Sequence, residues 1–289
     1  MHTRKDTGAV TLDHAVIVAS DLEKMTDAFA DLGMEPAYAG PLANDINHLS
    51  QVAFPDGSYI ELLSVMEEGD ESPWWDDHVQ ADGGPCAFAL ECADIEADAE
   101  RAGESAIPVE GPTRYGRERP DGTYFDYELA IVGEGGLATK YPFLISDHTP
   151  RSKRVSWPTD GLEDGELTGL AFVVVAVSDL ESEIEAYREA YGLAEPTVES
   201  VDSWGSEVAR FPESPIILAS PVNDGWVTDR LETFGERPAA YLFGSDDVDA
   251  SSDRFDLSSP TSLFDYDVQW IENDKLDAIN TRLGVVSDA

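Results

Sequence analysis

Two polar residues, each set inside an apolar strand-like segment, are the strongest candidates for chemistry. His14 lies within Leu12–Val18, and Glu61 lies within Tyr59–Leu63. Residues two apart in a strand share a face, so each polar side chain is expected to have apolar or aromatic neighbours: Leu12, Val16 and Val18 for His14, and Tyr59 and Leu63 for Glu61. An ionised carboxylate is costly to bury without a partner. Glu61 therefore needs a cation, a hydrogen-bond donor or solvent in a cleft.

Two kinds of chemistry fit an imidazole and a carboxylate that share a cleft. As metal ligands, His14 and Glu61 suit zinc, iron, manganese or nickel. Without a metal, Glu61 would be a general base and His14 its orienting or proton-shuttling partner, because desolvation raises the pKa of a carboxyl group. Taken alone, each residue has a simpler explanation: His14 as a hydrogen-bonded core histidine, and Glu61 as an edge residue that faces water.

Further polar residues are candidates for substrate contacts. His48 begins a strand, and its imidazole would enter the same cleft if that strand lay beside the strand of His14; a polar strand-end residue is the simpler explanation. Arg114, Arg117 and Arg119 place three of the 18 basic residues within six positions. Guanidinium groups bind carboxylate or phosphate bidentately, so the cluster suits an anionic substrate. Pairing with surface acids explains Arg114 and Arg117 equally well.

Composition limits the class of protein. A chain of 289 residues predicts two domains at about 150 residues each. The 18 Lys and Arg against 59 Asp and Glu give a net charge of −41, which repels nucleic acids and anionic membranes. The longest apolar run, 170–177, is eight residues, whereas a membrane-spanning helix needs about 20. The polar amino terminus has no signal-peptide pattern. We expect a cytoplasmic monomer or homodimer whose partner is a small-molecule ligand.

The acidic residues are interleaved with strand-like apolar runs, unlike the composition of disordered chains. With 5 Lys and 13 Arg among the basic residues, the pattern is typical of acidic-surfaced cytoplasmic proteins from halophiles. Charge repulsion destabilises such a fold at low salt, and molar salt shortens the Debye length to about 3 Å. The sequence therefore predicts a fold that needs high salt, which a melting temperature unchanged between molar and low-millimolar KCl would contradict.

Four segments of the chain repeat one pattern. Leu12–Glu23 and Leu170–Glu181 each run from an apolar strand into Ser-Asp-Leu-Glu, so Ser20 and Ser178 are predicted helix N-caps. Weaker copies are Cys86–Glu96 and Ala239–Asp249, and short strands are predicted after the helices: 35–39, 48–54, 58–65, 108–112, 124–132, 139–146, 207–211, 216–220 and 266–270. The chain is thus predicted to contain four β-α-β-β-β units, paired into domains 10–150 and 167–289, with a linker at 151–166.

Tandem units of this kind resemble the vicinal oxygen chelate superfamily, and the first half is similar to the glyoxalase-like domain family. The segments that carry the resemblance are Leu12-Asp-His14, Ser20-Asp-Leu22, Leu32-Gly33, Asn47-His48-Leu49, Asp56-Gly-Ser-Tyr-Ile-Glu-Leu62, Arg119-Pro-Asp-Gly122 and Pro142-Phe-Leu-Ile145. The resemblance implies an α+β fold in which each pair of units forms an eight-stranded, half-open barrel around a cleft. Members often bind a divalent metal there, through the first and last strands of each unit.

The resemblance assigns roles to particular residues. His14 and Glu61 match the first-strand and fourth-strand ligand positions, which makes them the implied catalytic and metal-binding pair. The other positions carry residues that bind no metal: Ala87 and Phe143 in the second unit, and Phe172 and Ile217 in the third. Half of the four-ligand site is therefore present. Tyr59, Phe143, His48 and Arg119 are the implied substrate contacts, and Arg119 is favoured because it lies in the family-like Arg-Pro-Asp-Gly segment.

The implied function is that of a lyase, isomerase or dioxygenase acting on a small oxygen-rich or anionic molecule, with or without one divalent metal. The alternative is a non-catalytic binding or sequestering protein of the bleomycin-resistance type, which the missing ligands favour. All five histidines precede residue 150, so the second domain is expected to be a degenerate copy. Trp74 and Trp75 suit either a ligand-pocket wall or, more simply, packing beneath a linker.

Overall fold

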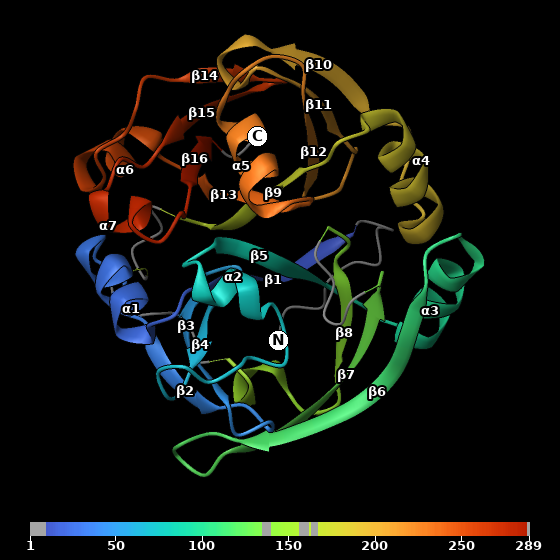
Figure 1. Cartoon of the computed structure of the whole chain (residues 1–289), viewed down its shortest axis with the longest axis vertical. Helices are drawn as coiled ribbons and strands as arrows, with labels where there is room; N and C mark the ends of the chain where they lie inside the picture. Colours follow the sequence, from blue (N-terminus) through green and yellow to red (C-terminus); the bar gives the residue numbers. More distant parts are fainter. Residues whose placement is uncertain (1–9, 135–139, 156–161, 163–166, 288–289) are drawn as a thin grey trace.

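The computed structural model describes residues 10–134, 140–155, 162 and 167–287. Two curled eight-stranded sheets form the two halves of the molecule (Figure 1). Their strand orders are equivalent, β2-β3-β4-β1-β5-β8-β7-β6 in the first and β10-β11-β12-β9-β13-β16-β15-β14 in the second. This α+β arrangement of four repeated units in two half-open barrels confirms the predicted fold class.

The first half contains the elements that build one barrel and its covering helices. They are β1 (Thr11–Val18), α1 (Leu22–Asp31), β2 (Ala37–Pro41), β3 (Asn47–Ala53), β4 (Tyr59–Val65), α2 (Asp76–Gln80), β5 (Gly84–Glu91), α3 (Ile95–Glu104), β6 (Val109–Glu118), β7 (Tyr124–Val132) and β8 (Phe143–Asp147). A short 3-10 helix, η1 (Arg151–Lys153), follows. Strand β6 extends six residues beyond the predicted 108–112, and so includes Arg114 and Arg117.

The second half repeats the plan with one shorter edge strand, β14, in the place of β6. Its elements are β9 (Gly169–Ala176), α4 (Leu180–Tyr191), β10 (Thr197–Val201), η2 (Asp202–Trp204), β11 (Ser206–Arg210), β12 (Ile216–Pro221), α5 (Trp226–Phe234), β13 (Arg237–Ser245), α6 (Val248–Arg254), β14 (Thr261–Leu263), β15 (Tyr266–Trp270), α7 (Asp274–Asp277) and β16 (Leu283–Ser287). The strands β10, β14 and β16 were not predicted, because these segments are short and lack a regular alternation.

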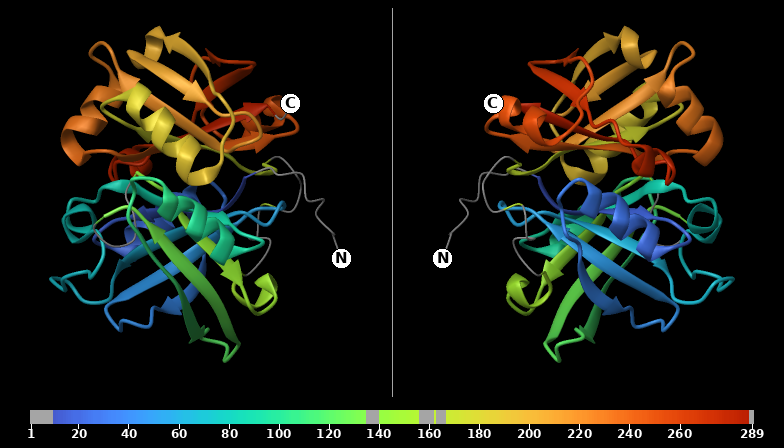
Figure 2. Two further views of the ribbon diagram at one scale, coloured as in Figure 1. Left: turned by 90° about the vertical axis from the view of Figure 1, so that its right-hand side faces the viewer. Right: turned by 90° about the vertical axis from the view of Figure 1, so that its left-hand side faces the viewer.

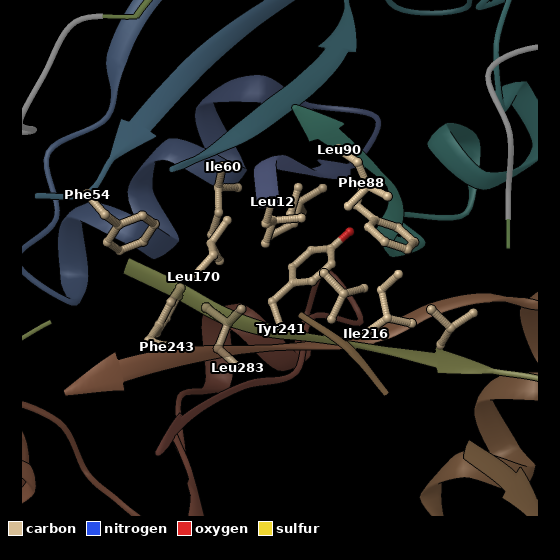
Figure 3. Packing of buried hydrophobic residues seen from close by; sticks show 14 of the residues in the cluster. Leu12, Phe54, Ile60, Phe88, Leu90, Leu170, Ile216, Tyr241, Phe243 and Leu283 are labelled. Carbon is tan, nitrogen blue, oxygen red and sulfur yellow. The ribbon is translucent and has the colours of Figure 1, made fainter. Parts of the chain in front are cut away.

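The halves are stacked with helices meeting on both sides of the junction. Figure 2 shows α3 beside α4 on one side, and α1 beside α7 on the other. Between the sheets lies a core to which both contribute, with Leu12, Ile60 and Phe88 from the first half and Leu170, Tyr241 and Phe243 from the second (Figure 3). No helix among the described residues is long and apolar enough to cross a membrane.

Tyr241 links the second half to the backbone of the first. Its hydroxyl lies 2.7 Å from the carbonyl oxygen of Val16 and 2.9 Å from that of Ala87, and it accepts a hydrogen bond from the Cys86 amide. The register between β1 and β5 shifts immediately after Val16. A shift of this kind leaves backbone groups without their ladder partners. The second half therefore supplies a side chain that satisfies them.

The helix N-caps differ from the sequence prediction. The helix N-caps are the aspartates that follow the predicted serines, because the side chains of Asp21 and Asp179 accept hydrogen bonds from backbone amides in the first turn. The serines instead bind the acid that precedes the next unit: Ser20 donates to Asp82, and Ser178 donates to Glu236. Each serine thus joins the two units of its half.

A bulge in β1 changes the face on which Leu12 lies. The register with β5 shifts between Leu12 and His14, and the extra residue, Asp13, interrupts the alternation of faces. Leu12 therefore packs in the core between the halves, whereas Val16 packs inside the first barrel. The prediction that Leu12 shares a face with His14 is wrong for this reason.

Candidate functional site

The interior of the first barrel holds a cavity of about 310 Å³. This volume lies at the lower end of the range for small-molecule sites, about 300–1,000 Å³. Its polar and aromatic lining includes His14, Tyr59, Glu61, Trp74, Trp75, Tyr115, Arg117, Phe125, Tyr127, Phe143 and Arg154. The cavity therefore combines a few convergent polar groups with a largely aromatic wall.

His14 and Glu61 meet on one side of this cavity. Strands β1 and β4 are parallel neighbours, and Glu61 lies opposite Val16, two residues beyond His14. Both side chains therefore lie on the barrel-facing surface, with His14 Nε2 3.9 Å from Glu61 Oε2. The structure brings together the two residues that the sequence singled out. The register also identifies the equivalent position in the second unit. Phe143 lies opposite Ala89 in β5 and β8, as Glu61 lies opposite Val16 in β1 and β4, and Phe143 is apolar.

Asp13, the bulge residue, fixes the orientation of His14. Its Oδ1 lies 2.6 Å from His14 Nδ1, and the carboxylate is fully buried. Burial alone would raise the pKa of Asp13, but Arg154, the hydrogen bond from His14 and Arg151 hold that pKa well below its usual value. An ionised carboxylate can only accept hydrogen bonds. His14 must therefore carry a proton on Nδ1, and its Nε2 faces Glu61.

Arg154 connects both sides of the site. Its guanidinium binds the Asp13 carboxylate at 2.9 and 3.0 Å and the Asp147 carboxylate at 2.7 Å on both oxygens. It also donates to the hydroxyl of Tyr59. The Tyr59 hydroxyl lies 3.5 Å from Glu61 Oε1, and the Tyr59 ring stacks on His14 with centroids 4.7 Å apart. One buried cation thus organises the surroundings of both candidate catalytic groups.

Arg151 and Arg154 were not predicted as site residues, and both lie in the predicted linker. Arg151 donates to Asp13 Oδ2 at 2.6 Å and to the Gly57 carbonyl at 2.6 Å. Residues 151–155 therefore close one end of the first barrel, whereas 156–161 and 163–166 of the predicted linker lie outside the described residues. The available signal was the density of positive charge: Arg151, Lys153 and Arg154 fall within four positions of a chain with net charge −41.

Arg117, rather than Arg119, reaches the cavity. Within β6 the side chains alternate, so Arg117 lies on the barrel side, whereas the exposed Arg114 pairs with Asp126. Arg117 Nη1 donates to the carbonyls of Ala39 and Pro41 at 3.0 and 3.1 Å, and so joins the two edge strands β6 and β2. Arg119 lies beyond the end of β6, in the turn where its amide donates to Thr123, and it does not line the cavity.

His48 also lies away from the cavity. Strand β3 is next to β4 rather than β1, and His48 pairs with Ser64 on the face opposite Leu49 and Leu63. It lines an outer groove and packs edge-on against Tyr38, with ring centroids 5.9 Å apart. The condition on which the sequence placed His48 in the cleft, adjacency to the strand of His14, is therefore not met.

Gln51 is a polar residue beside Glu61 that was not predicted from the sequence as part of the site. It lies directly opposite Glu61 across β3 and β4, and its side chain is fully buried. Neither its amide nitrogen nor its amide oxygen has a hydrogen-bond partner in the described part of the chain. A buried amide without a partner costs free energy, so Gln51 is an unusual feature of this wall.

The aromatic wall includes two residues whose role the sequence left open. Trp74 and Trp75 line the cavity, so the ligand-wall interpretation fits the structure better than packing beneath a linker. Burial, followed by the nearby Glu61 carboxylate, raises the pKa of Tyr127 to about 12. The Tyr127 hydroxyl therefore keeps its proton at neutral pH and can donate a hydrogen bond to a ligand oxygen.

The donor set does not fit a resident divalent metal. Among the described residues there is no group of three or more His, Cys, Asp or Glu side chains placed to hold a metal ion. His14 and Glu61 contribute two donors, and the other two positions that the resemblance implies are occupied by Ala87 and Phe143. Catalytic zinc sites use three protein ligands. His14 and Glu61 alone are therefore one ligand short of such a site.

Comparisons with known proteins identify the family and support the fold. A sequence model of the glyoxalase-like domain family matches residues 12–191. A hypothetical protein from Staphylococcus aureus has a similar fold, with TM-score 0.63, 14% identity, and coverage of 96% of this chain and 100% of that one. A mutant of 4-hydroxymandelate synthase from Streptomyces coelicolor gives TM-score 0.68 at 13% identity, over 96% and 92%.

A shorter likeness involves methylmalonyl-CoA epimerase from Streptomyces coelicolor, which is 21% identical over 43% of this chain and 99% of its own, with TM-score 0.38. A search of curated protein sequences finds no significant match. The likeness to solved structures shows the two-barrel fold. Because the family match extends over more than half of the sequence, this chain belongs to the glyoxalase-like domain family.

Proposed function

We propose that the cavity of the first half is an active site for proton transfer without a metal, of lyase or isomerase type, on a small oxygen-rich organic molecule. The observation that carries the proposal is the line of Asp13, His14 and Glu61, with separations of 2.6 and 3.9 Å. This line supplies an oriented imidazole next to a carboxylate at the edge of a largely aromatic cavity. Such groups are effective acid–base catalysts when they lie within reach of a substrate proton.

The residues suggest an order of events. Glu61 takes the proton from a carbon next to a carbonyl group, and the C–H electron pair moves through the carbon–carbon bond onto the carbonyl oxygen. The Tyr127 hydroxyl donates a hydrogen bond to that oxygen. His14 Nε2 accepts the proton from Glu61, and the ionised Asp13 stabilises the resulting imidazolium. If the proton returns to a different position, the reaction is an isomerisation. If a leaving group departs instead, the reaction is the elimination that a lyase catalyses.

Isotope exchange tests this proposal. Purified protein in molar KCl and D2O is incubated with a panel of 2-oxo acids, and loss of the C3–H signal is followed by NMR. We expect exchange faster than in buffer alone, and a reduction of about 10²–10⁴-fold in Glu61→Gln. His48→Gln is the matched control, because His48 lies on the other face of the sheet. A compound that binds in the cavity but exchanges no faster than in buffer would reject the proposal.

A non-catalytic binding protein is the second candidate. The observation that favours it is the aromatic lining, in which Phe143 occupies the counterpart position of Glu61. Such a protein would bind the ligand with the same affinity in wild type and Glu61→Gln and would exchange no proton in either. Binding and exchange measured on the same samples therefore separate the two candidates.

A site that binds a divalent metal through His14 and Glu61 is the third candidate. It is supported by the match of these two residues to the metal-ligand positions that the family resemblance implies. Metal analysis after desalting tests it on wild type and Glu61→Ala. We expect neither protein to retain stoichiometric zinc, iron, manganese or nickel, because two donors hold a metal weakly. One metal per chain in the wild type, lost in Glu61→Ala, would replace the metal-free version.

The setting of this function is also a proposal. The net charge of −41 supports a cytoplasmic protein of a salt-accumulating organism, acting on a small molecule without nucleic-acid or membrane partners, as a monomer or homodimer. Unfolding of the protein is therefore measured first in molar KCl and then at lower KCl concentrations. A melting temperature that falls as KCl is diluted is the expected result.

A further inference from the structure

We infer that the cavity of the first barrel takes a single-ring aromatic compound that carries one acidic group, with the acid on Arg117 and the ring along Phe125 and Tyr127. The inference rests on the site of the proposed function and names the class of its ligand. Three features of the cavity support it. They are flat aromatic surfaces, one arginine with hydrogen-bond donors available for a ligand, and a carboxylate that determines the orientation of the ligand.

The first feature is a row of stacked rings on β6 and β7. The ring of Tyr127 lies between Tyr115 and Phe125, with centroid distances of 6.1 and 6.0 Å and interplanar angles of 27° and 20°. On β1 and β4, which line the same cavity, His14 stacks on Tyr59 at 4.7 Å. Aromatic surfaces favour offset-stacked or edge-on contacts with another ring. A flat aromatic ligand therefore suits this cavity better than a branched aliphatic one.

The second feature is the guanidinium of Arg117. It lies over the Phe125 ring, with Cζ 5.1 Å from the ring centroid, at the end of the aromatic row. Its two hydrogen bonds to backbone carbonyls both use Nη1, so Nε and Nη2 donate no hydrogen bond within the described part of the chain. Two such donors match the two oxygens of a carboxylate.

Arg154, the other arginine that lines the cavity, is already saturated. Its guanidinium binds the carboxylates of Asp13 and Asp147 and the hydroxyl of Tyr59. An anion that displaced these partners would leave buried carboxylates without a counter-charge, which is strongly unfavourable. Arg117 is therefore the better-suited anchor for a ligand anion.

The third feature is the position of Glu61 relative to that anchor. A ligand carboxylate next to Glu61 would meet a like charge in a poorly solvated site, which is unfavourable. The acid therefore binds at Arg117, and the opposite part of the ligand faces Glu61 and His14. The volume of about 310 Å³ suits one ring with a short substituent.

Binding of four small probes tests the ligand class. Phenylacetate carries a ring and an acid, benzyl alcohol a ring alone, acetate an acid alone, and cyclohexylacetate an acid on a non-planar ring. Calorimetric titration of the whole chain in molar KCl measures each affinity. We expect phenylacetate to bind at least about 10-fold more tightly than each of the other three, because it alone uses both the stacked wall and the guanidinium.

Variants of β6 test the anchor. Arg117→Gln is expected to weaken phenylacetate binding by about 10- to 100-fold, the loss of a charged hydrogen-bonded pair, and to leave benzyl alcohol unchanged. Arg114→Gln is the matched control, because Arg114 is on the same strand and pairs with Asp126 outside the cavity. Because Arg117 also joins β6 to β2, a second variant, Arg117→Lys, retains the positive charge at this seam and should restore part of the affinity.

Three results would overturn the inference: equal affinities for phenylacetate and cyclohexylacetate, equal affinities for phenylacetate and benzyl alcohol, or the same effect from Arg117→Gln and Arg114→Gln. The proposed function fails differently. Glu61→Gln should abolish proton exchange yet bind phenylacetate at least as tightly as wild type, because it removes a like charge. Tight aromatic-acid binding without exchange in the wild type would reject the function alone, whereas exchange without aromatic preference would reject the inference alone.

Discussion

Where the first half carries His14 and Glu61, the second half carries Phe172 and Ile217. The equivalence follows from the registers, because Glu61 lies opposite Val16 in β1 and β4, and Ile217 lies opposite Val174 in β9 and β12. Phe172 and Ile217 pack in the interior of the second barrel. The same strand order thus surrounds a cavity with polar groups in one half and a cluster of buried apolar side chains in the other.

Tryptophans account for much of this difference. In the second barrel the rings of Trp204, Trp226 and Trp270 contact one another with centroid distances of 5.3–5.5 Å. In the first barrel Trp74 and Trp75 stay at the cavity wall. A fold therefore does not determine a site, and side-chain volume at a few interior positions does. The second half instead supports the first, for example through Tyr241 at the β1–β5 register shift.

The largest expected effect comes from removing the buried cation of the first half. Arg154→Met leaves the carboxylates of Asp13 and Asp147 without their main partner, and should lower the free energy of unfolding by about 3–5 kcal/mol. Denaturant unfolding in molar KCl measures it. Lys153→Met, at the exposed neighbouring position, is the control and should change stability little. A loss below about 1 kcal/mol in Arg154→Met would show that the network does not hold this barrel together.

The contrast between a core and a cavity wall is tested by two tryptophan substitutions. Trp204 is buried in the second barrel, so Trp204→Ala should cost about 3 kcal/mol or more. Trp74 is partly exposed at the cavity of the first, so Trp74→Ala should cost about 1 kcal/mol or less, and should weaken ligand binding instead. Similar losses of stability in the two variants would mean that the first barrel is packed as a core.

The smallest expected effect concerns the unpaired amide beside Glu61. Gln51→Leu removes a buried polar group that has no partner among the described residues, and should raise the free energy of unfolding by about 1 kcal/mol. Gln80→Leu, at an exposed position of α2, is the control. Destabilisation by Gln51→Leu would indicate that the amide has a partner in solution.

The sequence was sufficient to predict that His14 and Glu61 face one cavity and that the fold repeats four units, because period-two alternation and repeated segments can be read directly from the residues. It did not predict the roles of Asp13 and Leu12, because a single-residue bulge reverses the faces without a distinctive residue pattern. Arg154 was missed for another reason: its partners are up to 141 positions away. Arg119 was favoured on a motif, whereas the length of β6 decided that Arg117 faces the cavity.

The central claim is that Asp13 orients His14 so that Nδ1 carries a proton and Nε2 faces Glu61 within the first barrel. NMR of ¹⁵N-histidine-labelled protein at alkaline pH tests it directly, with His14→Gln used to assign the signal. The account predicts a His14 imidazole protonated on Nδ1, whose preference for that tautomer is lost in Asp13→Asn and whose Nε2 signal changes in Glu61→Gln. A His14 protonated on Nε2, or unaffected by both substitutions, would contradict it.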